Sequence, residues 1–241
     1  MTVARWLAAL LDLLLPPRCL GCDDPLPLDP PARWLCPGCR LRLRPPPLPR
    51  CPRCDTPTIS PCPVCPRLPV GLAWARSAFV YDGVGRRLVH ACKFEGWLGL
   101  VDLFAERCAP LLAQWPADAL VPVPTSPVRR RARGYGVPER LAAALAQRTG
   151  LPVMPLLARP RQRRSQTTLS FAERHANVAD AFALAPGVRL PAGARLVLVD
   201  DVWTTGATVA VCAARLLEAG ARAVGALTVA RALPPGAPKL D

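Results

Sequence analysis

The feature that most constrains the fold of this chain is the segment Leu196–Thr208, which reads LVLVDDVWTTGAT. Its first part is a continuous apolar run, as in a buried strand of a parallel sheet. Two carboxylates, Asp200 and Asp201, come next, and a helical pattern begins at Thr208 after a short run of small residues. A helix that starts directly after such a turn has free N–H groups, which bind anions. The segment therefore predicts an α/β domain with a phosphate site.

The side chains of this loop suit a sugar phosphate. Hydroxyls, small side chains and backbone N–H groups that can converge on one phosphate come from Thr204, Thr205, Gly206, Ala207 and Thr208. The carboxylates of Asp200 and Asp201 can accept hydrogen bonds from sugar hydroxyls. A phosphate beside a vicinal diol describes ribose 5-phosphate. The pattern assigns no catalytic residue.

The apolar run, the acidic pair and the TTG-small-T sequence resemble the signature with which type I phosphoribosyltransferases bind phosphoribosyl pyrophosphate (PRPP). The resemblance implies an α/β fold, a type I phosphoribosyltransferase-like, mostly parallel sheet with flanking helices. It implies that Asp200 and Asp201 bind the ribose hydroxyls and that Thr204 to Thr208 hold the 5-phosphate. It also implies magnesium, which balances the charge of the pyrophosphate.

Four CxxC pairs occupy a stretch that is dense in proline and has almost no periodic apolar pattern, so side-chain burial alone cannot hold it together. The pairs are Cys19/Cys22, Cys36/Cys39, Cys51/Cys54 and Cys62/Cys65. Each pair can face one tetrahedral ion, and two pairs complete a closed four-thiolate site, which predicts a small zinc-ribbon-like domain with structural zinc. The spacing allows sequential pairing or an interleaved cross-brace. A disulfide framework is the alternative for an exported protein.

The sequence pattern changes near residues 67–72, from a Cys- and Pro-rich stretch to alternating strand and helix patterns, and this change predicts the domain organisation. We expect an N-terminal amphipathic helix in residues 1–18, a double CxxC zinc module in 19–70 and a phosphoribosyltransferase-like domain in 71–241. In the last, β-rich runs alternate with helical patterns, which is typical of βαβ units. The expected elements are strand 75–81, helices 85–94 and 98–115, strand 119–123, helix 138–148, a short strand near 153, strand 195–200, helix 208–219 and strand 223–230.

The apolar start of the chain bears on its location. It is too short to span a bilayer and is interrupted by Asp12, so no transmembrane segment is expected. Together with thiols spaced for metal, this favours the cytoplasm. A peripheral contact at the inner face of the membrane is the alternative.

The formal net charge of +14 favours anionic partners. Two arginine groups stand out. The first is Arg129, Arg130, Arg131 and Arg133, and the second is Arg159, Arg161, Arg163 and Arg164 in the polar segment 159–177. Guanidinium groups can bind pyrophosphate oxygens bidentately, or they can follow the backbone of single-stranded DNA. The sequence leaves both interpretations open.

The order of motifs along the chain narrows the resemblance. The CxxC pairs are followed by a helix with Lys93, by Val121–Pro124 with the first arginine group, by Gln166–Ser170 with Arg174 and Asn177, and by the PRPP signature. This order is similar to that of the ComF family, whose members are associated with DNA uptake in natural transformation. One departure is the segment 133–137, which reads RGYGV where members commonly have RGFNQ. Polar contacts of the Asn-Gln pair are therefore absent here.

The resemblance implies a protein that binds PRPP or a ribose 5-phosphate group, handles single-stranded DNA and works with proteins of the competence machinery. Two other functions fit the same residues, because fold alone does not decide function. One is an active phosphoribosyltransferase on an unidentified acceptor. The other is a regulator that senses PRPP without turnover.

Overall fold

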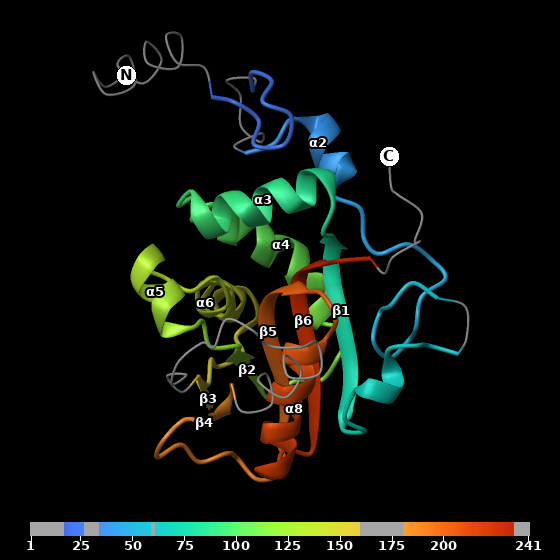
Figure 1. Ribbon diagram of the computed structural model, residues 1–241, viewed down its shortest axis with the longest axis vertical. Coiled ribbons are helices and arrows are strands. Elements are labelled where there is room, and N and C mark those ends of the chain that lie inside the picture. The colour runs from blue at the N-terminus through green and yellow to red at the C-terminus, as the bar shows by residue number, and fades with distance from the viewer. Residues whose placement is uncertain (1–16, 27–33, 59–60, 160–180, 234–241) are drawn as a thin grey trace, which may run out of the picture.

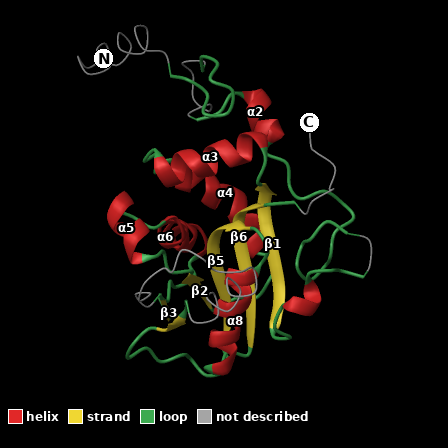
Figure 2. Ribbon diagram, in the orientation of Figure 1, coloured by secondary structure: helices red, strands yellow, loops and turns green. Residues whose placement is uncertain are grey.

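The computed structural model describes residues 17–26, 34–58, 61–159 and 181–233. Its centre is a four-stranded sheet in which every neighbouring pair of strands is parallel (Figures 1 and 2). The strand order is β1 (Leu72–Val80), β6 (Ala223–Arg231), β5 (Arg195–Trp203) and β2 (Ala119–Pro122). The helix expected in residues 1–18 lies almost wholly outside the described residues.

Helices cover both faces of this sheet. They are α3 (Gly83–Phe94), α4 (Leu100–Leu112) and α6 (Val137–Thr149) on one face and α8 (Ala207–Glu218) on the other. The apolar run of β5 serves both layers, because successive side chains of a strand point to opposite faces. Val197 and Val199 lie in the hydrophobic cluster of α4 and α6, whereas Leu196 and Leu198 lie in that of α8. The expected α/β class, a parallel sheet with flanking helices, is confirmed.

Strand β5 is longer than the sequence predicts. It was expected to end at Asp200 but continues to Trp203, because Val202 and Trp203 still pair with Ala230 and Arg231 of β6. The acidic pair thus lies inside the strand near its carboxyl end. Helix α8 begins at residue 207, one residue earlier than expected. The short strand expected near residue 153 is a single bridge to β2.

Several short elements have too few residues for a periodic pattern, and the sequence did not predict them. They are α2 (Pro37–Arg42), the 3-10 helix η1 (Cys65–Arg67), α5 (Pro127–Arg133), β3 (Leu157–Ala158) and β4 (Ala183–Leu184). The longest of them, α5, has residues that typically begin and end a helix. The Ser126 hydroxyl accepts a hydrogen bond from the Arg129 N–H at 3.4 Å, and Gly134 ends the helix with φ of 81°.

The cysteine segments lie at two different places on this scaffold. The first lies beside α3 at one end of the molecule, and the second lies beside β1 (Figure 1). Cys19 and Cys39 belong to the same hydrophobic cluster as residues of α3, while Cys51 and Cys54 belong to the cluster that contains Leu72 of β1. Each segment is therefore packed against the sheet layers through its own cysteines.

The structure reveals a repeat in these segments that extends beyond the cysteines. Residues 18–25 and 50–57 both read R-C-x-x-C-D-x-P, and in each the first and last residues form an isolated antiparallel bridge. The arginine pairs with the aspartate at 3.2 Å in both, as Arg18 with Asp23 and Arg50 with Asp55. Both aspartates have positive φ, a conformation that aspartate tolerates better than most residues. Only the second pair is shielded, since Asp55 is fully buried.

Candidate functional site

The loop between β5 and α8 has the features of an anion site. Gly206 is the N-cap of α8 with φ of 81°, and because it has no side chain, it offers no cap of its own to the first-turn N–H groups. Thr204 and Thr205 are exposed, and the Ala207 N–H donates to the Thr205 hydroxyl at 3.4 Å. We call residues 204–208 the phosphate loop.

A hollow of about 390 Å³ lies at the carboxyl edge of the sheet, where open α/β sheets bind ligands. The acidic pair and the phosphate loop contribute Asp200, Asp201, Thr204 and Thr208 to its wall. Its cationic wall is formed by Lys93, Arg129, Arg133 and Arg159. Of the predicted sugar-phosphate residues, Thr205, Gly206 and Ala207 are in the adjoining loop and do not line the hollow. The hollow thus combines carboxylates, hydroxyls and cations.

The two carboxylates differ in their surroundings. The ammonium of Lys93, on α3, lies 2.6 Å from Asp201 Oδ1, and the two side chains are 18% and 16% exposed. Burial, followed by the neighbouring charge of Asp201, raises the pKa of Asp200 to about 8. Asp200 Oδ1 accepts a hydrogen bond from the Asp201 N–H at 2.8 Å. In the ligand-free protein at neutral pH, Asp200 therefore holds a proton beside an ion-paired Asp201.

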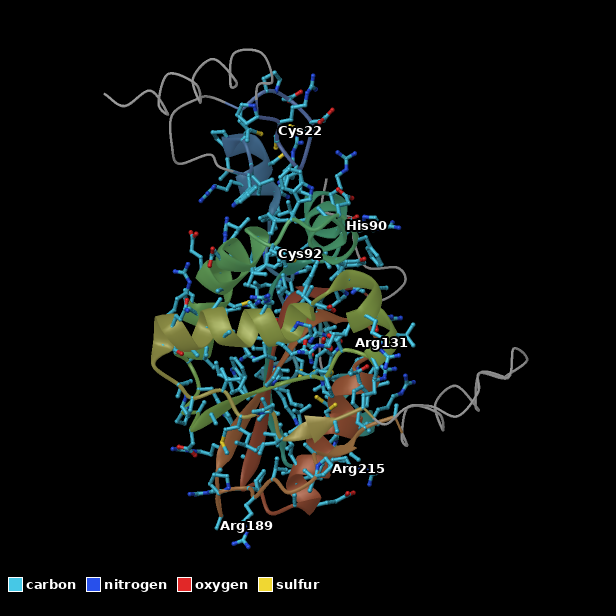
Figure 3. All side chains as sticks on the ribbon, turned by 90° about the vertical axis from the view of Figure 1, so that its left-hand side faces the viewer. Cys22, His90, Cys92, Arg131, Arg189 and Arg215 are labelled. Carbon is cyan, nitrogen blue, oxygen red and sulfur yellow. The ribbon has the colours of Figure 1, made fainter. Side chains whose placement is uncertain are left out.

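The structure divides the first arginine group. Arg129 and Arg133 line the hollow, whereas Arg130 and Arg131 do not and are exposed on α5. Figure 3 labels Arg131 beside α5. The guanidinium of Arg133 lies 4.4 Å from the ring centre of Phe94, a cation–π distance. Of the second group, Arg159 lines the hollow, whereas Arg161, Arg163 and Arg164 lie outside the described residues.

Three further residues shape the hollow in ways that sequence reasoning did not assign. Lys93 was noticed only as part of a motif, although it contacts Asp201, which is 108 positions away. Glu139 accepts hydrogen bonds from the N–H and hydroxyl of Thr125 at 3.2 and 2.9 Å, and so holds the loop after β2. A Cβ at Gly136 would lie 2.0 Å from the Glu139 carboxylate.

The cysteines form two four-sulfur clusters. The first cluster is Cys19, Cys22, Cys36 and Cys39, and the second is Cys51, Cys54, Cys62 and Cys65, with the ligand atoms of each within 4.8 Å of one another. The pairing is therefore sequential, and the cross-brace is not formed. Sulfur–sulfur distances of 3.5 and 3.7 Å are far beyond a disulfide bond of about 2.05 Å. They approach the roughly 3.8 Å edge of a tetrahedron with Zn–S bonds of about 2.3 Å.

Local hydrogen bonds also suit thiolates. The N–H groups of Gly21 and Cys36 each donate to Cys19 Sγ at 3.3 Å. N–H donors favour the charged form of a sulfur, which is the form that binds metal. Both clusters are thus compatible with structural zinc, and zinc would supply the cohesion that these proline-rich segments lack.

The fold and this edge define an α/β protein with a candidate sugar-phosphate site and two cysteine clusters. No family model matches the chain. It is 32% identical over 236 residues to the DNA utilization protein YhgH of Salmonella typhimurium, covering 92% of this chain and all of that protein. It is 30% identical over 156 residues to the competence protein ComFC of Streptococcus pneumoniae, covering 65% of this chain and 67% of that one. The chain belongs to the ComF family, which these relatives represent.

Comparison with solved structures gives partial matches to enzymes. Glutamine PRPP amidotransferase from B. subtilis is 27% identical and covers 54% of this chain and 25% of its own, with a TM-score of 0.36. Purine phosphoribosyltransferase from Pyrococcus horikoshii is 16% identical and covers 59% of this chain and 93% of its own, also with a TM-score of 0.36. Overlap at this level adds no argument about function. Among the described helices, none has the length and apolar content needed to cross a membrane.

Proposed function

We propose that this protein binds PRPP, or another compound with a ribose 5-phosphate group, and handles single-stranded DNA during its uptake or utilization. The observation that carries the proposal is the hollow in which the acidic pair, the phosphate loop and four cations meet. The phosphate loop would hold the 5-phosphate through its hydroxyls and first-turn N–H groups. Asp200 and Asp201 would accept hydrogen bonds from the ribose hydroxyls.

The pyrophosphate end of PRPP would lie toward the arginines of the hollow. Arg129 and Arg133 supply guanidinium groups on the side of α5, and Arg159 supplies another from the end of β3. Magnesium, held by the pyrophosphate oxygens and the nearby carboxylates, would offset the remaining charge. This arrangement accounts for a site that contains both anions and cations.

The DNA part of the proposal rests on different residues. Arg130 and Arg131 are exposed and do not line the hollow, so they can contact a phosphate backbone even when PRPP is bound. Arg130 also lies 3.9 Å from the Glu139 carboxylate, and DNA phosphates would compete with this partly exposed pair. The relatives are named for competence and DNA utilization, which favours a nucleic-acid partner and proteins of the uptake machinery. We place the protein in the cytoplasm, in contact with the inner face of the membrane during uptake.

We also propose the underlying organisation. Residues 19–70 hold two structural zinc ions in two separate clusters, and residues 71–241 form the phosphoribosyltransferase-like domain against which both clusters pack. The two cysteine clusters and the start of β1 at Leu72 support this division.

The decisive test is binding of PRPP and of ribose 5-phosphate to the zinc-loaded full chain by calorimetry. Hydrogen bonds to a charged ligand contribute roughly 1.5–3 kcal/mol, so Thr205→Ala should weaken binding by about tenfold or more. Thr205→Ser keeps the hydroxyl and is the matched control, which should bind within about threefold of the parent. Unchanged affinity in both Thr205→Ala and Asp201→Asn would reject the site.

A second candidate function, phosphoribosyl transfer, is favoured by the position of Arg133 and Arg159 on the same hollow as the acidic pair. Positioning and charge stabilisation are most of what displacement at the anomeric carbon requires from a protein. Release of pyrophosphate from PRPP on addition of an acceptor would establish transfer. Tight PRPP binding without pyrophosphate release, whichever nucleobase or DNA is added as acceptor, would exclude transfer and favour a protein that only binds PRPP.

A further inference from the structure

Arg231, the last residue of β6, is a charged side chain in the interior. It is 2% exposed, and its guanidinium donates to the carbonyl oxygen of Cys54 and, at 3.3 Å, to the Thr56 hydroxyl. Its Nε finds no hydrogen-bond partner among the residues that the structure describes. A buried cation is costly unless a negative charge lies close to it, so the surroundings of Arg231 must supply one.

Two sources of negative charge lie near Arg231, the buried carboxylate of Asp55 and the second cysteine cluster, and only the charge of the cluster depends on metal. In the described part of the chain no carboxylate forms an ion pair with Arg231. Burial lowers the pKa of Arg231 to about 10, and the charges that oppose this shift belong to Asp55 and to the cluster's cysteines. Four thiolates around a divalent ion carry a net charge of about −2, whereas four thiols or two disulfides carry none. A metal-loaded second cluster is thus the natural counter-ion of this guanidinium.

On its other side, Arg231 is separated from the phosphate loop by one aromatic ring. The guanidinium lies 4.4 Å from the ring centre of Trp203, the last residue of β5, which is itself 2% exposed. A Cβ at Gly206 would lie 2.6 Å from that ring, so the indole is in direct contact with the loop's N-cap glycine. The N–H of Ala232 donates to the Trp203 carbonyl at 2.8 Å and fixes the same strand end.

We propose that Arg231 is a positioning residue that couples metal binding in the second cysteine cluster to ligand binding in the phosphate loop. With metal bound, the fixed Cys54 carbonyl and the cluster charge hold the guanidinium flat against Trp203, and the indole supports Gly206. Without metal the cation keeps only the counter-charge of Asp55, and the support under the loop loosens. This inference rests on the proposed function, because the state of the phosphate loop is measured through its affinity for the ribose 5-phosphate compound.

The first test compares two arginines that both anchor the second cluster. Arg53 donates to the carbonyls of Leu72 and Pro69 and does not contact Trp203, which makes it the matched control. Coupling between sites is typically 5–150-fold, so Arg231→Met should weaken PRPP binding by about tenfold with zinc still bound. Arg53→Met should bind PRPP within about twofold of the parent. Equal affinities in the two zinc-loaded variants would overturn the coupling.

The second test uses the parent protein, because linkage requires that the ligand also affect the metal. Equilibrium competition with a chromogenic chelator should report two bound zinc ions, and saturating PRPP should raise the affinity for one of them by about tenfold. The other ion, in the first cluster, is the internal control. The gain in zinc affinity should disappear in Arg231→Met. PRPP that binds but raises the affinity for neither ion, or for both equally, would overturn the coupling, whereas a parent that binds no PRPP would instead overturn the proposed function.

Discussion

Binding of Mg²⁺-PRPP should release a proton from Asp200. The raised pKa of about 8 means that the free protein holds this proton at neutral pH. A cation and sugar hydroxyls both favour the ionised carboxylate, so the complex contains Asp200 without it. The affinity should therefore increase with pH by about tenfold per unit up to about pH 8 and then level off. Between pH 6 and pH 7 the expected gain is about tenfold.

Calorimetry in two buffers with different ionisation enthalpies counts the protons directly, and about one should be released at pH 6.5. The ligand's own phosphates titrate near pH 6, so their contribution is measured with Asp200→Asn and subtracted. In Asp200→Asn the proton released by Asp200 should be absent, and the PRPP affinity should change with pH only as much as the ligand's own phosphates require. A proton count in the parent that equals the count in Asp200→Asn would refute the reasoning.

The same group makes a prediction about stability without ligand. Asp200 is protonated in the folded chain up to about pH 8 but ionises in the unfolded chain near its ordinary value of 3.8. Between these values the folded state binds the extra proton, so the contribution of Asp200 to stability falls as pH rises. Urea unfolding of the zinc-loaded protein should show this fall in the parent and a flatter profile in Asp200→Asn. Parallel profiles would contradict the shifted pKa.

Three other outcomes are expected. Replacing Cys51 and Cys54 by serine should remove one of about two bound zinc ions and unfold the second cluster's segment; metal analysis with unchanged zinc would count against the site. Lys93→Met should destabilise the fold by about 3 kcal/mol in urea unfolding, and Asp201→Asn in the same chain should recover part of the loss; a loss without recovery would exclude the ion pair as its cause. Single-stranded DNA affinity should fall with log salt at a slope of roughly −3 to −4, and alanines for the arginines of segment 161–164 should flatten it by about two units; a shallow parent slope would refute backbone binding.

Local sequence was sufficient where one segment contains the whole signal. The apolar run before Asp200 predicted a buried strand, and the small residues before Thr208 predicted the turn and helix, because strand, turn and helix N-terminus are set by neighbouring residues. The CxxC spacing likewise brings two sulfurs to one ion without help from the rest of the chain. The end of β5 was misplaced by three residues, since its extension to Trp203 depends on pairing with β6.

Tertiary structure alone decided which charges meet. The ion pair of Lys93 with Asp201 spans 108 positions, and the contact of Arg231 with Thr56 spans 175. No periodicity or spacing encodes such contacts, because they depend on how distant strands are ordered in the sheet. The same holds for the arginine group, in which Arg133 lines the hollow and Arg131 does not.

The sequence by itself thus determined which chemical groups this protein has, namely a candidate sugar-phosphate loop, an acidic pair, cysteine pairs and an excess of arginine. The tertiary structure decided their partners. It grouped the cysteines in sequential order, gave Asp201 a lysine and placed a buried arginine between the second cluster and the phosphate loop. The physical reason is that hydrogen-bonding preference and charge belong to a residue, whereas burial, which sets the strength of a charge's interactions, belongs to the packed chain.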